Sequence, residues 1–198
     1  MKSELTRTLS KVEGFENPKI SLEQYLTPPE MAADILHTAY MNQDLEGRKV
    51  ADFGTGTGIL AIGAALLGAE VKAFDKDSDA LENAERNAEK LGVRQEIEFV
   101  EGDVEKVNES FDTVVMNPPF SVHSDSGIAF LRKAVSCSNA VYTVSHPGSR
   151  EVIKDFVENS NHVITALEEY RISLPSTYGF HTEEGRETEV DVIITQKG

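Results

Sequence analysis

The sequence contains one cysteine and no tryptophan, and it has no long run of apolar residues. Cys137 has no partner for an internal disulfide, and the five histidines stand too far apart to match the spacing of metal ligands. No apolar run approaches the roughly 20 residues that cross a bilayer, and the polar N-terminus, residues 1–10, is unlike a signal peptide. We therefore expect a cytoplasmic protein without a structural metal, an internal disulfide or a membrane anchor.

Positive charge is also scarce, with 19 Lys and Arg residues against 34 Asp and Glu residues and a formal net charge of −15. Proteins that bind nucleic acids usually gain affinity from a basic surface, so this balance counts against a broad phosphate-binding face. A salt-rich cytoplasm, a basic partner or a substrate other than nucleic acid would each account for it. The first 20 residues differ, because four basic residues there stand against three glutamates.

A chain of 198 residues fits one domain. Leu5, Leu9 and Val12 fall on one side of a short helix predicted over residues 3–13, and glycine and proline end it at residues 14–18. The sequence thus predicts an N-terminal arm at residues 1–20 and a single domain at residues 21–198.

Strand and helix patterns alternate along most of the domain. Two final strands follow with no helix between them, which indicates an antiparallel hairpin at one edge. The alternation predicts an α/β domain: a Rossmann-like, doubly wound, seven-stranded and mostly parallel sheet. The predicted strands are residues 49–53, 71–74, 97–100, 111–116, 140–145, 163–170 and 189–195, and the predicted helices are residues 59–67, 80–91, 128–135 and 152–157, with a further helix starting at Pro28 and Pro29 behind a Thr27 cap.

A glycine-rich run, Gly-Thr-Gly-Thr-Gly, follows the first predicted strand. Gly54, Gly56 and Gly58 allow a sharp turn in which the backbone and the N–H groups of the next helix approach a ligand closely. The dinucleotide fingerprint requires glycine at position 59, where this chain has Ile59. The run therefore favours a nucleoside ligand that has no pyrophosphate.

Three aspartates stand at the ends of three successive predicted strands. Asp52 precedes the glycine run, and Asp75 closes the second strand about 20 residues further on, where an acid can accept both ribose hydroxyls. Asp103 follows the third strand and could accept a hydrogen bond from an adenine amine. Each alone could be a helix cap or a turn former, but together they predict one cofactor site. S-adenosylmethionine has the matching ribose, adenine and methionine tail, and it carries no phosphate.

The segment Asn117-Pro118-Pro119-Phe120 follows the fourth predicted strand. Two prolines fix two φ angles and remove two backbone donors, which leaves carbonyl groups free to meet a ligand. The Asn117 oxygen and the Pro118 carbonyl could accept both N–H groups of a planar amine and so localise its lone pair for methyl transfer. Phe120 would stack on the substrate and Pro119 would keep the pocket rigid. The alternative is a plain turn that ends the strand.

These motifs resemble those of a known family. Residues 52–58 resemble the first motif of class I S-adenosylmethionine-dependent methyltransferases, and Asn-Pro-Pro-Phe resembles the catalytic motif of their amino-methylating branch. Together with residues 22–27 and 174–181, they resemble the methyltransferase-like protein 5 family and its archaeal relatives. The resemblance implies the class I methyltransferase fold and methylation of N6 of an adenosine in small-subunit ribosomal RNA.

The resemblance also implies site residues and a partner. Gln24, Tyr25 and Thr27 should lie over the methionine end of the cofactor, and residues 117–120 should hold a flipped-out adenine. A small zinc-binding activator protein should accompany the enzyme. Independently of the resemblance, Tyr178, Phe180 and His181 are candidates for stacking on RNA, with packing of the hairpin against the domain as the alternative. His123 is a candidate for substrate contact, with an exposed loop histidine as the alternative.

Two other functions stay open at this level. A glutamine amide in a protein such as a release factor offers the same planar N–H₂ group for N5-methylation. That branch usually has tyrosine where this chain has Phe120, and it carries an extra N-terminal helical domain. The chain could also act without catalysis, as a cofactor-binding factor in ribosome assembly.

Overall fold

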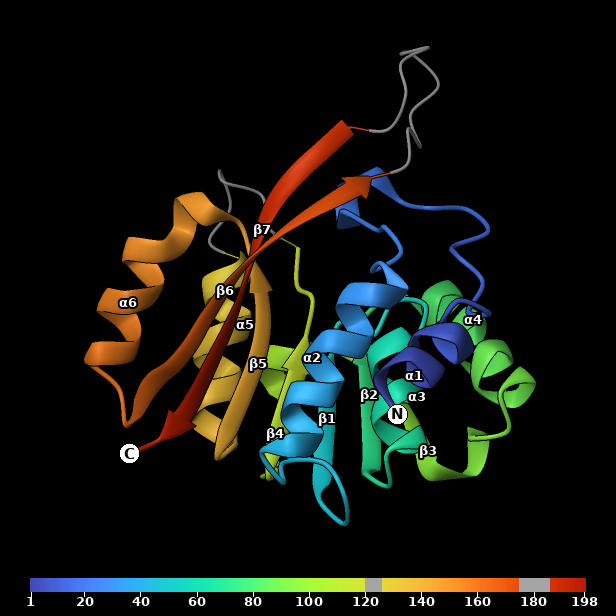
Figure 1. Ribbon diagram of the computed structural model, residues 1–198, viewed down its shortest axis with the longest axis horizontal. Coiled ribbons are helices and arrows are strands. Elements are labelled where there is room, and N and C mark those ends of the chain that lie inside the picture. The colour runs from blue at the N-terminus through green and yellow to red at the C-terminus, as the bar shows by residue number, and fades with distance from the viewer. Residues whose placement is uncertain (120–125, 175–185) are drawn as a thin grey trace.

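One seven-stranded sheet runs through the computed structural model, which describes residues 1–119, 126–174 and 186–198 (Figure 1). The strand order is β3-β2-β1-β4-β5-β7-β6. The first five strands are parallel, and β7 is antiparallel to both β5 and β6. The strands are β1 (Lys49–Phe53), β2 (Glu70–Asp75), β3 (Ile97–Glu101), β4 (Thr113–Met116), β5 (Ala140–Ser145), β6 (His162–Leu174) and β7 (Arg186–Lys197). The predicted α/β class and the antiparallel edge are confirmed.

Helices cover both faces of the sheet, and successive residues of the central strands β1, β4 and β5 are therefore buried on one side or the other. The described α-helices are α1 (Lys2–Leu9), α2 (Pro29–Met41), α3 (Ile59–Leu66), α4 (Ser78–Lys90), α5 (Ser126–Cys137) and α6 (Arg150–Glu158). On β4, Val115 faces one core with α1, α2 and α3, whereas Val114 and Met116 face a second core with α5 and α6. No helix among the described residues is long and apolar enough to cross a membrane.

The start of α2 differs from the prediction. Thr27 was expected to cap this helix, but the N-cap residue is Pro28, and no side chain there bonds a backbone N–H. The Thr27 hydroxyl instead accepts a hydrogen bond from the side chain of Asn117. The predicted cap is therefore wrong, because a contact with a distant residue occupies the hydroxyl.

Residues 1–20, expected to form an arm ahead of the domain, share its core. Leu5 and Leu9 of α1 are buried with residues of α2 and α3. The segment that follows α1 crosses α4, where the Glu13 N–H donates to Asn87 and Asn83 donates to the Gly14 carbonyl. The helix and its extension therefore pack against the rest of the domain.

Leu9→Ala should destabilise the protein by about 2–5 kcal/mol, because the side chain is fully buried and its removal leaves a cavity. Arg7→Ala, on the exposed side of the same helix, should change the free energy of unfolding by no more than about 0.5 kcal/mol. Urea denaturation of the two variants measures the difference. Equal stabilities would show that α1 does not belong to the core.

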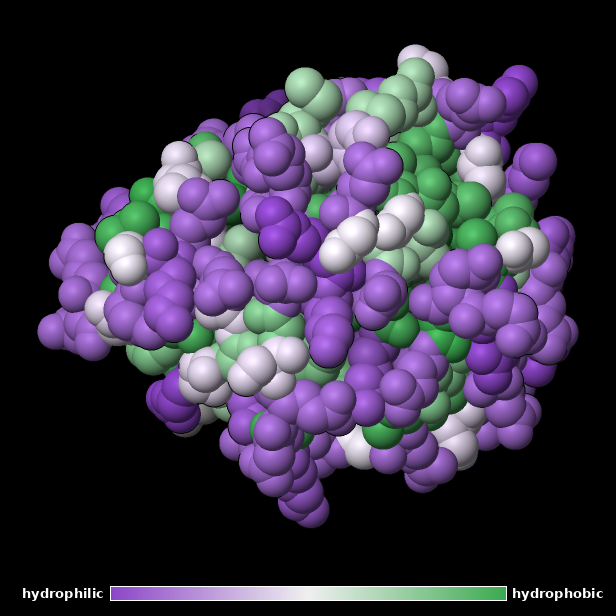
Figure 2. Space-filling view, turned by 90° about the horizontal axis from the view of Figure 1, so that it is seen from below, coloured by the Kyte–Doolittle hydropathy of each residue, from purple (hydrophilic) through white to green (hydrophobic). Residues whose placement is uncertain are grey.

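The two ends of the sheet differ in character. The carboxyl ends of the parallel strands lie at the top in Figure 1, and Figure 2 shows the opposite end from below. Hydrophilic side chains cover most of that lower face, with apolar side chains gathered in separate patches. The ligand-binding features are at the other end of the sheet.

Candidate active site

A cavity of about 530 Å³ opens at the carboxyl ends of the parallel strands. The strand order reverses between β1 and β4, and ligands of open α/β sheets bind outside the strand ends at such a point. The volume lies within the range of small-molecule sites, about 300–1,000 Å³. Its walls come from the loop after β1, the ends of β2, β3 and β4, the start of α5, and the segment before α2.

The glycine run forms the predicted turn between β1 and α3. The N–H groups of Gly54 and Thr55 both donate to the Phe74 carbonyl of β2, at 2.9 Å each. Gly56 has φ of +55°, and a β-carbon there would lie 2.9 Å from the ring of Phe15. Only glycine meets both the conformation and the space, so the loop passes directly beneath Phe15 on the cavity wall.

Asp52 is buried beneath this turn, with 1% of its surface exposed. Its Oδ2 accepts from the Thr55 hydroxyl at 2.7 Å and from the Ala61 N–H at 3.0 Å. Its Oδ1 has no hydrogen-bond partner among the described residues. Burial raises the pKa of Asp52 to about 7. The carboxyl group therefore pins the turn and keeps one oxygen unsatisfied at the cavity.

Asp52→Asn should reduce the dependence of stability on pH. In the unfolded chain the carboxyl group of an aspartate has a pKa of about 3.9. Between that pH and about 7, the folded protein therefore binds more protons at Asp52 than the unfolded chain does. The stability contributed by Asp52 is thus present at low pH and is lost as pH rises through about 7. Urea denaturation at about pH 5 and about pH 8 should show a smaller change in the variant than in the wild type. The same change in both proteins would contradict the raised pKa.

Asp75 joins the end of β2 to the glycine turn. Its Oδ2 accepts from the Gly56 N–H at 2.9 Å, and its Oδ1 accepts from the Asp77 N–H at 3.0 Å. Burial raises the pKa of Asp75 above its usual value. Asp77 in turn accepts from the Lys19 ammonium at 2.5 Å and from the Gln24 amide at 2.7 Å. The predicted cofactor acid is therefore held in place from two sides.

Asp103 follows β3 and is exposed at the cavity rim. Its side chain accepts from the Glu105 N–H at 3.0 Å and caps a 3-10 helix at Val104–Lys106. The capping role considered for this residue is thus present, and the same side chain also lines the cavity.

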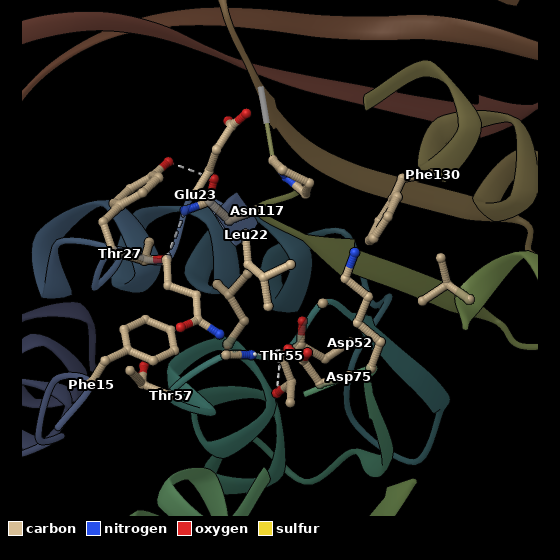
Figure 3. Close-up of a pocket in the computed structure, with 18 of the residues that line it drawn as sticks. Phe15, Leu22, Glu23, Thr27, Asp52, Thr55, Thr57, Asp75, Asn117 and Phe130 are labelled. Carbon is tan, nitrogen blue, oxygen red and sulfur yellow. Dashed lines mark hydrogen bonds between the residues drawn. The ribbon is translucent and has the colours of Figure 1, made fainter. Parts of the chain in front are cut away.

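Asn117 directly follows β4 and lies on the other side of the cavity from the acids, as Figure 3 shows. Its Oδ1 accepts from the Tyr25 hydroxyl at 2.9 Å, and its Nδ2 donates to the Thr27 hydroxyl at 2.8 Å. Burial raises the pKa of Tyr25 well above its ordinary value, so the phenol stays a donor at neutral pH. The amide is held at both of its polar atoms.

Most of the predicted site residues that the structure describes line this one cavity. Gly58 does not: a β-carbon there would meet Ala84 of α4 at 3.0 Å. Pro118 lines a separate hollow beside α5. Five predicted residues, Phe120, His123, Tyr178, Phe180 and His181, lie outside the described residues. The predicted residues on the cavity wall are Gln24, Tyr25, Thr27, Asp52, Gly54, Gly56, Asp75, Asp103, Asn117 and Pro119.

Two aromatic residues on the wall were not predicted from the sequence. The Phe15 ring lies against Gly56, and the Phe130 ring of α5 lies 3.2 Å from where a Gly54 β-carbon would be. Phe15 falls in a stretch that looks only like a helix break, and Phe130 falls in a helix where an apolar residue suggests core packing. No local pattern separates these roles.

No group of three or more His, Cys, Asp or Glu side chains within the described ranges could hold a metal ion.

Comparison with known proteins identifies the family. Residues 30–168 match the model of the methyltransferase small domain. The rRNA N(6)-adenosine-methyltransferase METTL5 of Danio rerio is 38% identical, with 96% of each chain covered. The corresponding Drosophila melanogaster protein is 36% identical, with 94% of this chain and 92% of that protein covered. The crystal structure of PH1948 from Pyrococcus horikoshii superposes with a TM-score of 0.90 at 37% identity, covering 99% of this chain and 97% of that one. The chain belongs to the methyltransferase small domain family and, within it, to the METTL5-like group.

Proposed function

We propose that this protein transfers a methyl group from S-adenosylmethionine to the N6 amine of an adenosine in ribosomal RNA, in the small subunit. The observation that carries the proposal is the Asn117 amide, fixed at the end of β4 across the cavity from Asp52 and Asp75. The activity named for the relatives that match nearly the whole chain supports the same reaction.

The cavity fits this cofactor. Several acidic side chains line it, Lys76 is the one basic side chain among the described residues of its wall, and Asp52 has an unsatisfied oxygen. Such walls favour a ligand that brings positive charge and hydroxyl donors, and they disfavour a phosphate. S-adenosylmethionine carries a sulfonium, an ammonium and two ribose hydroxyls. The acidic lining is therefore complementary to it.

Each predicted cofactor contact has an atom that can make it. Both oxygens of Asp75 already accept a backbone N–H, and each keeps a second lone pair for a ribose hydroxyl. Asp103 at the rim would accept from the adenine amine. Gly54 and Gly56 line the same cavity, and their backbone would face the methionine portion.

The cofactor supplies an electrophilic methyl group, and the protein supplies alignment. The Oδ1 of Asn117 accepts one hydrogen bond from Tyr25 and has a second lone pair for a substrate N–H. We assign the other N–H to the Pro118 carbonyl. These two acceptors would draw the amine towards tetrahedral geometry and localise its lone pair, so no strong base has to remove a proton before attack. Phe120 would stack on the adenine once it has left the RNA stack.

RNA binding needs specific contacts, because the acidic composition does not provide a broad positively charged surface for the phosphates. Two basic residues of the N-terminal segment are engaged in ion pairs, Lys2 with Asp34 and Lys19 with Asp77. His123, Tyr178, Phe180 and His181 stay our candidates for stacking on RNA. A small zinc-binding activator protein would supply further surface.

Mapping N6-methyladenosine in ribosomal RNA from a strain that lacks the gene tests the proposal. One small-subunit site should lose the modification. The wild-type gene should restore it, and a gene encoding Asn117→Ala should not. Retention of every site in the deletion strain would rule the proposal out. Normal ribosomes in the Asn117→Ala strain, with the mark absent, would favour the binding role without catalysis.

A further inference from the structure

The side-chain amide of Asn117 needs a defined plane to serve as an acceptor. A terminal amide rotates in a broad, nearly two-fold potential, so nothing in the side chain itself selects one orientation. In the structure both polar atoms of the amide are hydrogen-bonded: Oδ1 accepts from Tyr25 at 2.9 Å, and Nδ2 donates to Thr27 at 2.8 Å. The orientation therefore depends on two hydroxyls that come from outside the strand.

Both hydroxyls are themselves held firmly. Thr27 is 5% exposed and is followed by Pro28 and Pro29, whose rings restrict the backbone. The ring of Tyr25 packs against the core formed by α1, α2 and α3. Its buried phenol has a pKa well above its ordinary value. The two groups can thus act as fixed reference points for the amide.

The segment that carries them, residues 19–27, is anchored at its other end beside the cofactor acids. Gln24 donates to Asp77 at 2.7 Å and accepts from the Lys19 N–H at 2.9 Å. The preceding residue, Glu23, has φ of +51°, a conformation that costs a non-glycine residue about 1 kcal/mol or more. The chain turns sharply there, and the neighbouring side chains of Gln24 and Tyr25 reach different parts of the sheet edge: Asp77 at the start of α4, and Asn117 just after β4.

We propose that Tyr25 and Thr27 are positioning residues, which hold the Asn117 amide in the plane that presents its free lone pair to the substrate amine. This inference rests on the proposed function and deepens it. It assigns these two hydroxyls to the catalytic amide, whereas the family resemblance places their residues at the methionine end of the cofactor. Loss of either hydroxyl should lower kcat and leave cofactor affinity almost unchanged.

The test compares Tyr25→Phe, Thr27→Val and Thr27→Ser. Tyr25→Phe and Thr27→Val remove one hydroxyl each with little change in shape, and kcat should fall about tenfold or more in each, with the cofactor Kd within about twofold of wild type. Thr27→Ser keeps the hydroxyl and should recover most of the rate. Wild-type kcat in both Tyr25→Phe and Thr27→Val would overturn the proposal, and so would a loss fully explained by a weaker cofactor Kd.

A double-mutant cycle shows whether the two residues act through Asn117. In the Asn117→Ala background, Tyr25→Phe and Thr27→Val should cause no further loss of rate. An additional tenfold loss there would mean that the hydroxyls act elsewhere.

A second readout does not depend on activity. The side-chain amide resonances of Asn117, assigned by their absence in Asn117→Ala, should shift strongly in Thr27→Val and Tyr25→Phe and only slightly in Thr27→Ser. Unmoved resonances would contradict the positioning role even if the wild-type enzyme methylates RNA. If the variants show strong shifts but the wild-type protein methylates no RNA, the result would count against the proposed function alone.

Discussion

Asn117→Ala is expected to lower kcat for methyl transfer by about 10²–10³-fold, the usual effect of removing one preorganised polar group from an active site. The side chain accepts from Tyr25 and donates to Thr27, and neither of these hydrogen bonds involves the cofactor acids. Cofactor affinity should therefore stay within about twofold of wild type. Single-turnover kinetics and calorimetry with S-adenosylmethionine measure the two quantities.

Asn139→Ala is the matched control for this variant. It makes the same substitution at an exposed position just before β5, at the opposite end of the sheet from the cavity. Its kcat should equal that of the wild type. If the Asn117→Ala enzyme keeps more than about a third of the wild-type kcat, Asn117 has no catalytic role in the methyl transfer.

Asp75→Asn should raise the cofactor Kd by tenfold or more. Each hydrogen bond from a ribose hydroxyl to a charged acceptor contributes about 1.5–3 kcal/mol, and the amide replaces one acceptor oxygen with a donor. The same change disturbs the bonds from the Gly56 and Asp77 N–H groups, which fix the glycine turn on the cavity wall. Calorimetry with S-adenosylmethionine gives the Kd directly.

Asp155→Asn, at an exposed position on α6, serves as the control for the charge change alone and should bind the cofactor as the wild type does. If Asp75→Asn also binds with unchanged affinity, the ribose assignment of Asp75 is wrong.

Local sequence patterns predicted the sheet well, because each strand needs only a short apolar run to be buried. Val50 and Val71 pair on neighbouring parallel strands, and the chain between them contains a glycine turn and an alanine-rich helix, as the sequence indicates. The boundaries differ by a few residues. The hydrogen-bonding partner of Thr27 could not be predicted in this way, since it lies 90 residues away in the chain.

The candidate site was predictable to the extent that its residues stand at strand ends. Asp52, Asp75 and Asn117 were selected for that reason, and they line one cavity because the carboxyl ends of parallel strands meet at one edge. Tyr25 was selected only through the family resemblance, and its contact with Asn117 spans 92 residues. Such contacts depend on how the segment before α2 folds back over the sheet, and the local hydrophobic pattern does not predict that path.

The N-terminal segment shows a similar limit. Its hydrophobic spacing correctly predicted which side of α1 is buried, but the glycine and proline break after it suggested an arm, and the basic residues there were expected to be available for other contacts. The ion pairs of Lys2 and Lys19 with Asp34 and Asp77 instead tie the segment to the domain. A count of charges does not show which of them already have partners.

The chemical identity of the methylated product separates methylation of RNA from methylation of protein. Purified protein would be incubated with S-adenosylmethionine carrying a labelled methyl group and with small ribosomal subunits from the deletion strain, and the RNA and protein would then be digested separately. We expect the label to appear in the RNA as N6-methyladenosine, and Asn117→Ala to lower its rate of incorporation by about 10²–10³-fold. Label absent from the RNA and present in protein as N5-methylglutamine would rule out RNA as the substrate.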